Sequence, residues 1–258
     1  MGQMHRLHHM KDRVLSIITV CLNEAPVIRR TAESIANQTY QDFEWIVVDG
    51  GSTDGTIEIL NKYRPRLGHM ISEPDSGIYF AMNKGIRRAT GAYVAFLNGG
   101  DTFHGPTSLA ECLPFLGRAD ILHGGVKQIA EDSVSNFHPN IGLVSPAYFY
   151  RNTLPHQATL ARRTLFERVG GFDESYRIIA DRVWLYRAAR MRATFLRMPQ
   201  IVSDFYIGGI SSAPGSAALM EAERHRFRMR HFPFRVRYDS TVSSVLSLCG
   251  KFRAALRK

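Results

Sequence analysis

The chain has 258 residues, of which 45% are hydrophobic and 22% charged, the balance of a folded domain rather than of a disordered chain. Its formal net charge of +10 favours an anionic partner, namely nucleotide phosphates, an acidic membrane surface or nucleic acid. Three scattered cysteines match neither a metal site nor a disulfide framework, which favours a reducing compartment.

The ends of the chain differ in composition from its middle. Residues 1–13 are polar and basic and are expected to form a disordered tail. No apolar run approaches the roughly 20 residues of a membrane span, and no signal peptide is recognisable. One domain is expected over residues 14–215, followed by a basic amphipathic helical extension over 216–258. The expected location is the cytoplasm, with or without peripheral attachment to the inner face of the membrane.

The first hundred residues alternate between apolar, β-branched runs and segments with helical spacing. Strands are predicted at Leu15–Leu22, Phe43–Val48, His69–Ser72 and Tyr93–Leu97, and helices at Val27–Gln38, Thr56–Lys62 and Ile78–Ala89. Strand and helix alternating at this spacing predict an α/β fold with a mostly parallel central sheet flanked by helices.

The pattern is less regular after Asp101. Helices are predicted near Ser108–Leu116 and Asp181–Arg190, a short strand at Ile121–His123, strand signals within Phe195–Tyr206, and a loop-rich stretch from Lys127 to Pro155. No repeat or clear linker divides this region, so it is assigned to the same domain.

Polar residues follow the three clearest strands, at Asn23–Glu24, Asp49–Asp54 and Asn98–Asp101. Ligands of open parallel sheets bind at the carboxyl ends of the strands. Asp49 can accept a hydrogen bond from a base or ribose, and Asp101 can hold Mg²⁺ or Mn²⁺ together with phosphate oxygens. Each has a plainer alternative, because DGGSTDG also suits a helix-capping turn and a lone aspartate also suits a surface turn.

Several other site motifs are absent from the sequence. It contains no GxGxxG after the first strand, no GxxxxGK[ST], and no HExxH, GxSxG or Cys/His zinc pattern. These absences argue against a dinucleotide-binding fold, a P-loop nucleotidase and the common hydrolase sites.

Six segments, taken together, resemble the inverting family 2 glycosyltransferases of the GT-A fold, the bacterial type that builds polysaccharides and glycolipids. They occur in the family's order between Leu15 and Ser212, and they read LSIITVCLNEA, FEWIVVDGGSTDGT, SEPDSGIYFAMNKGI, GAYVAFLNGGD, HQATLARRTLFERVGGFDESY and IADRVWLYRAA. The resemblance implies transfer of a sugar from a nucleotide-diphosphate sugar to an acceptor hydroxyl, with inversion and with Mg²⁺ or Mn²⁺.

The resemblance also implies roles for individual positions. Asp49 matches the aspartate that contacts the nucleoside, with Asn23 beside it. Asp75 and Asn83 match positions that line the nucleotide pocket. Asp101 matches the last carboxylate of the metal-binding motif.

Asp181 falls where the family carries its catalytic base, and it also suits the start of a helix. His156 is a further candidate contact to metal or diphosphate, or else a structural histidine. The chain departs from the family where many relatives have paired carboxylates, because Gly99 and Gly100 precede Asp101. Phe80 stands where relatives often have an acidic residue.

Partners and alternatives follow from the same resemblance. UDP is the default donor nucleotide by family frequency, with dTDP and GDP open, and the acceptor is a glycan or a lipid-linked molecule. The segment Ile207–Gly215 resembles a mobile lid, or is a plain surface loop. The arginine-rich tail suits an anionic membrane surface or a helix packed on the domain, and nucleic acid is not expected. The alternatives are a sugar-nucleotide nucleotidyltransferase and a non-catalytic nucleotide-sugar-binding subunit.

Overall fold

The structure, a computed structural model, describes residues 14–139, 144–209 and 215–239. The tail expected over residues 1–13 lies outside these ranges, as do residues 210–214 of the proposed lid and the last part of the extension, 240–258.

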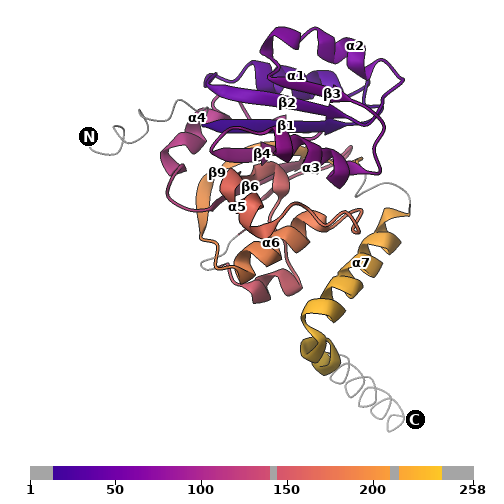
Figure 1. The fold of residues 1–258 in the computed structure, drawn as a ribbon, viewed down its shortest axis with the longest axis vertical. Helices are drawn as coiled ribbons and strands as arrows, with labels where there is room; N and C mark the ends of the chain where they lie inside the picture. The colour runs from indigo at the N-terminus through magenta and orange to yellow at the C-terminus, as the bar shows by residue number, and fades with distance from the viewer. Residues whose placement is uncertain (1–13, 140–143, 210–214, 240–258) are drawn as a thin grey trace.

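The described chain forms strands and helices in the order shown in Figure 1. The strands are β1 (Leu15–Cys21), β2 (Phe43–Asp49), β3 (His69–Ser72), β4 (Tyr93–Phe96), β5 (Thr102–Phe103), β6 (Ile121–Ile129), β7 (Val134–Phe137), β8 (Thr159–Arg162) and β9 (Phe195–Tyr206). The α-helices are α1 (Ile28–Ala36), α2 (Thr56–Asn61), α3 (Ile78–Arg88), α4 (Ser108–Cys112), α5 (Arg163–Val169), α6 (Ala180–Arg190) and α7 (Ser216–His231). Short 3₁₀ helices are η2 (Arg64–Arg66), η3 (Leu113–Phe115), η4 (Pro146–Tyr150) and η5 (His156–Ala158).

The strands within these ranges join one sheet in the order β3-β2-β1-β4-β8-β6-β9-β5, with β7 beside β6. Strands β3, β2, β1 and β4 are parallel, as the sequence predicts. The second half of the sheet is mixed: β8 runs antiparallel to both β4 and β6, whereas β6 and β9 are parallel. The parallel expectation rested on the helical crossovers of the first hundred residues, and the later strands lack such regular crossovers.

Two hydrophobic cores cover the two faces of this sheet, and β1 and β2 are therefore buried on both sides. Ile18 and Val20 of β1 face a core that includes α3, α5 and α6. Leu15 and Ile17 face the opposite core, with α1, α2 and α4. Side chains that alternate in this way along a strand point to opposite faces, which explains the continuous apolar run of β1. The polar residues that follow β1, β2 and β4 therefore lie at the carboxyl rim of a sheet that is covered on both faces.

The stretch Lys127–Pro155, expected to be loop-rich, contains a β-hairpin. Strand β6 continues to Ile129 and pairs with β7 across a short turn in which Ala130 N–H donates to the carbonyl of Ser133 (2.9 Å). All four residues of β7 are exposed. An exposed strand has no apolar alternation, so the sequence gives little sign of it.

Helix α7 lies beside α6 (Figure 1). Its Phe227 is fully buried and contacts the ring of Tyr186 of α6, with centroids 5.2 Å apart. Arg226 stacks on Tyr176 at 4.0 Å, and Arg235 stacks on Tyr150 at 4.6 Å. Several cationic side chains of the tail are thus used within the protein, which favours the packed-helix alternative for this segment. None of the described helices has the length and apolar character needed to cross a membrane.

Candidate active site

The turn after β2 is built around the carboxylate of Asp49. This side chain is fully buried and accepts hydrogen bonds from Gly51 N–H (3.0 Å), Ser52 N–H (2.9 Å), Ser72 Oγ (2.7 Å) and Ser52 Oγ. Burial by itself raises the pKa of a carboxyl group, but these bonds outweigh it and lower the pKa of Asp49. The Asp49 carboxylate is therefore already hydrogen-bonded within the chain, and the expected contact with a nucleoside stays a prediction.

Asn23 joins the end of β1 to the same turn. Its backbone N–H donates to Ser52 Oγ (2.7 Å), and its Oδ1 accepts from Thr53 N–H (3.0 Å). Asn23 has φ +53, a left-handed conformation that asparagine tolerates better than most residues. The residue is exposed at the rim, beside Asp49 as expected.

Asp75 lies across from this turn. It is half-buried, and its Oδ1 accepts from Gly77 N–H (2.9 Å). Its Oδ2 is 3.3 Å from the place where a Cβ on Gly50 would lie. Asn23, Asp49 and Asp75 are therefore brought together around the Asp49–Ser52 turn.

Asn83 of α3 is not part of that group. Its Nδ2 donates to the carbonyl of Phe172 (3.0 Å) and to Glu174 Oε1 (2.8 Å), and its Oδ1 accepts from Phe172 N–H (2.9 Å). The side chain is 7% exposed. Asn83 fastens the loop after α5 to α3, and its contact with a nucleotide stays a prediction.

Asp101 follows β4 and is 6% exposed. Its Oδ1 accepts from Tyr206 N–H at the end of β9 (3.1 Å), and the side chain of Gln157 also bonds to it. Burial raises the pKa of Asp101 to about 6, although the nearby charges of His156 and Arg30 oppose that rise. Loss of water is therefore the dominant influence on this carboxylate.

His156 connects the ends of β4 and α6. Its Nδ1 is 3.5 Å from Asp181 Oδ2, and its Nε2 is 3.2 Å from Asn98 Nδ2. The hydroxyl of Tyr79 lies 3.2 Å from Asp181 Oδ1 and donates to the carbonyl of Ile178 (2.8 Å). Asp181 is thus in the first turn of α6, with one oxygen facing a histidine and the other a tyrosine. His156 therefore contacts Asp181, and its charge also acts on Asp101.

Below the His156–Asp181 pair lies an apolar cavity of about 20 Å³. Its lining includes Phe96, Phe166, Phe172 and Trp184, and the rings of Phe166 and Trp184 are stacked with centroids 4.3 Å apart. An aromatic floor limits the access of water to Asp181 from the interior side.

Comparison with known protein families identifies the family of this chain. The family described as Glycosyl transferase family 2 matches residues 16–183, well over half of the chain. The chain belongs to glycosyl transferase family 2. It is 34% identical over 211 residues to the "PGL/p-HBAD biosynthesis glycosyltransferase" of Mycobacterium bovis, covering 79% of this chain and 81% of that protein.

Solved structures agree with this family 2 assignment in fold. S. aureus TarS 1–349 in complex with UDP-GlcNAc matches with a TM-score of 0.66 and 19% identity, over 84% of this chain and 66% of that one. The chain spans only 44% of the longer TarS chain of another crystal structure. Mannosyltransferase PcManGT from Pyrobaculum calidifontis, in complex with GDP-Man and Mn²⁺, matches with a TM-score of 0.61 and 22% identity, over 91% and 70% of the two chains. The fold is GT-A, as expected.

The family 2 assignment raises the question of whether the residues here fit a divalent metal. Within the described ranges, no three His, Cys, Asp or Glu side chains are grouped to hold one. Asp101 nevertheless offers a carboxylate, and Asn98 Oδ1 is buried without a hydrogen-bond partner. Oxygen donors of these kinds are the ligands that Mg²⁺ and Mn²⁺ take, completed by phosphate and water. The residues fit a metal that arrives with a diphosphate.

Sequence reasoning assigned no role to Glu24, the residue after Asn23. Its Cδ lies 3.2 Å from the position that a Cβ on Gly99 would occupy. Burial and the neighbouring charge of Asp101 raise the pKa of Glu24 to about 7, with Arg30 acting in the opposite direction. The only signal in the sequence was its place in CLNEA at the end of the first strand.

Glu223 of α7 was also missed. It is 5% exposed and accepts hydrogen bonds from three successive backbone N–H groups, those of Arg177 (2.6 Å), Ile178 (3.0 Å) and Ile179 (3.2 Å). These groups immediately precede α6, which begins at Ala180. A carboxylate at this place satisfies donors at the helix start and complements the helix dipole. Because 46 residues separate Glu223 from Arg177, local sequence patterns do not reveal the contact.

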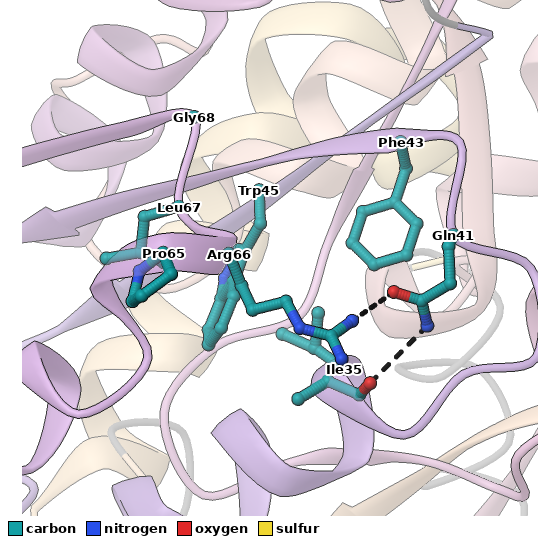
Figure 2. Close-up of a pocket in the computed structure, with 9 residues that line it drawn as sticks. Ile35, Gln41, Phe43, Trp45, Pro65, Arg66, Leu67 and Gly68 are labelled. Atoms are coloured by element: carbon teal, nitrogen blue, oxygen red, sulfur yellow. Dashed lines mark hydrogen bonds between the residues drawn. The ribbon is translucent and has the colours of Figure 1, made fainter.

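A larger pocket of about 220 Å³ lies at the opposite rim of the sheet, near the start of β2 (Figure 2). Phe43, Trp45 and Leu67 line it, and Arg66 donates to Gln41 Oε1 at its edge. None of the predicted site residues lines this pocket. It is therefore separate from the acidic rim.

Proposed function

We propose that this family 2 chain transfers a sugar from a nucleotide-diphosphate sugar to an acceptor hydroxyl, with inversion at the anomeric carbon. The observation that carries the proposal is the position of His156, which faces Asp181 at 3.5 Å and whose charge also acts on Asp101. The relatives add support: one is named as a biosynthesis glycosyltransferase, and solved neighbours hold UDP-GlcNAc or GDP-Man.

Asp181 is proposed as the catalytic base. A hydroxyl is a weak nucleophile until a carboxylate accepts its proton in the transition state. The acceptor oxygen then bonds to the anomeric carbon while the bond to the diphosphate breaks on the opposite face, which inverts the configuration. His156 and Tyr79 each face one oxygen of Asp181, and this arrangement supports a fixed orientation of the carboxylate.

Asp101 is proposed to hold Mg²⁺ or Mn²⁺ with the donor diphosphate. A bound divalent ion neutralises charge that develops on the leaving nucleotide. Asn23, Asp75 and the Asp49 turn form the neighbouring part of the rim, which supports a place there for the nucleoside. The donor base, the identity of the acceptor as a glycan or lipid-linked molecule, and attachment to the membrane surface stay predictions.

The test is a panel of UDP-, GDP- and dTDP-sugars with glycan and lipid-linked acceptors, with and without Mn²⁺, followed by mass spectrometry. The expected result is a glycosylated acceptor whose new bond has the inverted configuration by NMR. A retained configuration would overturn inversion. Exchange of the nucleotide instead of transfer would indicate a nucleotidyltransferase, and donor binding without turnover would indicate a non-catalytic subunit.

A further inference from the structure

Glu24 occupies the space that a second acidic residue after β4 would need. A Cβ atom on Gly99 would lie 3.2 Å from both Cγ and Cδ of Glu24, and one on Gly100 would lie 3.9 Å from Glu24 Oε2. Any side chain at position 99 would therefore meet the Glu24 side chain. The glycines that break the family pattern of paired carboxylates leave room for a carboxylate that comes from the end of β1.

The backbone on both sides fixes Glu24 in this place. Its N–H donates to Thr56 Oγ1 (2.8 Å), and its carbonyl accepts from the N–H groups of Val27 (2.9 Å) and Ile28 (2.8 Å) at the start of α1. These bonds connect the residue to both neighbouring helices. The backbone position of Glu24, from which its side chain reaches Gly99, is therefore fixed by the fold.

The carboxylate of Glu24 has no hydrogen bond or ion pair with any residue in the described ranges, although the side chain is half-buried. Arg30 is nearby, but its Nε donates to the carbonyl of Gly100 (2.6 Å) and its guanidinium stacks on Tyr206 at 3.7 Å. The negative charge of Asp101 acts on the Glu24 carboxylate more strongly than the opposing charge of Arg30 does, so a half-buried carboxylate here is unfavourable. A cation bound between Glu24 and Asp101 removes this conflict.

We propose that Glu24 is the second acidic ligand of a divalent cation bound with a nucleoside diphosphate, in the role that the family pattern gives to a residue after β4. This inference rests on the proposed function and deepens it. Asp101 supplies one carboxylate and Glu24 the other, and the unpartnered Asn98 Oδ1 is a further oxygen at the same strand end. With only two acidic ligands, the remaining positions belong to phosphate oxygens and water, the arrangement that Mg²⁺ and Mn²⁺ commonly take with phosphates.

The decisive experiment moves the carboxylate from one strand to the other. Mn²⁺ binding is measured by electron paramagnetic resonance with UDP, GDP or inorganic pyrophosphate present, for wild type, Glu24→Gln, Glu24→Ala and the double variant Glu24→Ala/Gly99→Asp. Gly99 is outside the positive-φ set, and Glu24→Ala removes two of the three atoms nearest to its Cβ position; the third, Cys21 Cβ at 3.3 Å, has to shift by a few tenths of an ångström, whereas Gly100 with φ +93 is unsuitable. Glu33→Gln, an exposed acid on α1, is the control with the same change of charge.

We expect Glu24→Gln to weaken Mn²⁺ binding at least tenfold, Glu33→Gln to leave it unchanged, and the double variant to bind more tightly than Glu24→Ala alone. Thermal unfolding checks that the variants fold, and Glu24→Gln is expected to melt at or above the wild-type temperature because an unpartnered charge is removed. Equal Mn²⁺ binding by wild type and Glu24→Gln overturns the inference, as does a double variant that binds no better than Glu24→Ala.

The two proposals fail in distinguishable ways. Sugar transfer that persists in excess chelator leaves the transferase proposal standing and removes the cation role of both Asp101 and Glu24. Conversely, Mn²⁺ binding with pyrophosphate that depends on Glu24, in a protein that turns over no sugar nucleotide, supports the cation site and overturns the transferase proposal.

Discussion

Two groups of acidic residues lie on the same rim of the sheet and differ in what satisfies them. After β2, Asp49 is buried but accepts four hydrogen bonds from N–H and O–H groups of its own chain and a longer one from Cys21 Sγ (3.7 Å), and its pKa is lowered. Glu24, after β1, is half-buried and Asp101, after β4, is buried, and their pKa values are raised to about 7 and about 6. Burial raises the pKa of all three carboxyl groups, and only at Asp49 do hydrogen bonds outweigh it; the bonds that Asp101 accepts from Tyr206 and Gln157 do not. The first group builds the rim, and the second is left available to a ligand.

Asp181→Asn gives the largest expected effect on activity. Loss of the base should lower kcat by about 10²–10⁴-fold, while donor affinity and the unfolding temperature stay near wild type. Steady-state kinetics and nucleotide titration measure the two quantities. If Asp181→Asn instead lowers the unfolding temperature strongly, Asp181 has a structural role rather than a catalytic one.

Asp49→Asn should show the reverse pattern, with a loss of stability of about 3 kcal/mol, because an amide cannot accept all four hydrogen bonds and leaves buried donors unpaired. Urea unfolding measures this loss, and Asp75→Asn, with its single backbone bond, is the milder control. If Asp49→Asn unfolds like wild type but loses nucleotide binding, Asp49 contacts the nucleoside directly, and the structural role assigned to it here is wrong.

Glu223→Ala should lower kcat by up to about 10²-fold with little change in donor KM, because the start of the helix that carries Asp181 loses its cap and shifts. The kcat of Glu223→Gln, which keeps an oxygen acceptor, should lie between that of Glu223→Ala and that of wild type. A merely structural role would lower the unfolding temperature of both variants without separating kcat from KM.

The two groups should also respond oppositely to pH in the metal-free protein. The raised pKa values of Glu24 and Asp101 mean that the folded state binds these protons more tightly than the unfolded state, from ordinary values of 4.5 and 3.8. Their contribution to stability is present below about pH 4 and is lost as pH rises toward about 7. The contribution of Asp49 is instead lost as pH falls below its ordinary pKa. Thermal unfolding from pH 4 to 8 should show a smaller decline for Glu24→Gln than for wild type.

Local patterns in the sequence predicted the first half of the fold well. Strands β1, β2, β3 and β4 lie where the apolar runs indicated, and the GT-A fold and the family are confirmed. The exposed strand β7 and the mixed second half of the sheet were not foreseen, because exposed strands carry no apolar signal and strand direction depends on distant pairing.

The candidate site was predictable in its residue types more than in its contacts. Whether an aspartate is satisfied depends on partners far away in the sequence: Ser72 is 23 residues from Asp49, and Tyr206 is 105 residues from Asp101. Glu24 was overlooked for the same reason, since its neighbours Gly99 and Asp101 belong to another strand end. Motifs name candidates, and only the folded contacts separate an anchored acid from an available one.

The hydrogen bonds from Arg177, Ile178 and Ile179 to Glu223 have a practical consequence for building hybrid enzymes. For exchanging C-terminal segments between relatives, a junction near the start of α7 is an obvious choice, because every described strand lies before it. Such a junction separates the helix carrying Asp181 from the carboxylate that completes its first turn. A functional hybrid needs its crossover beyond Glu223, or an incoming segment with an acid in the same position.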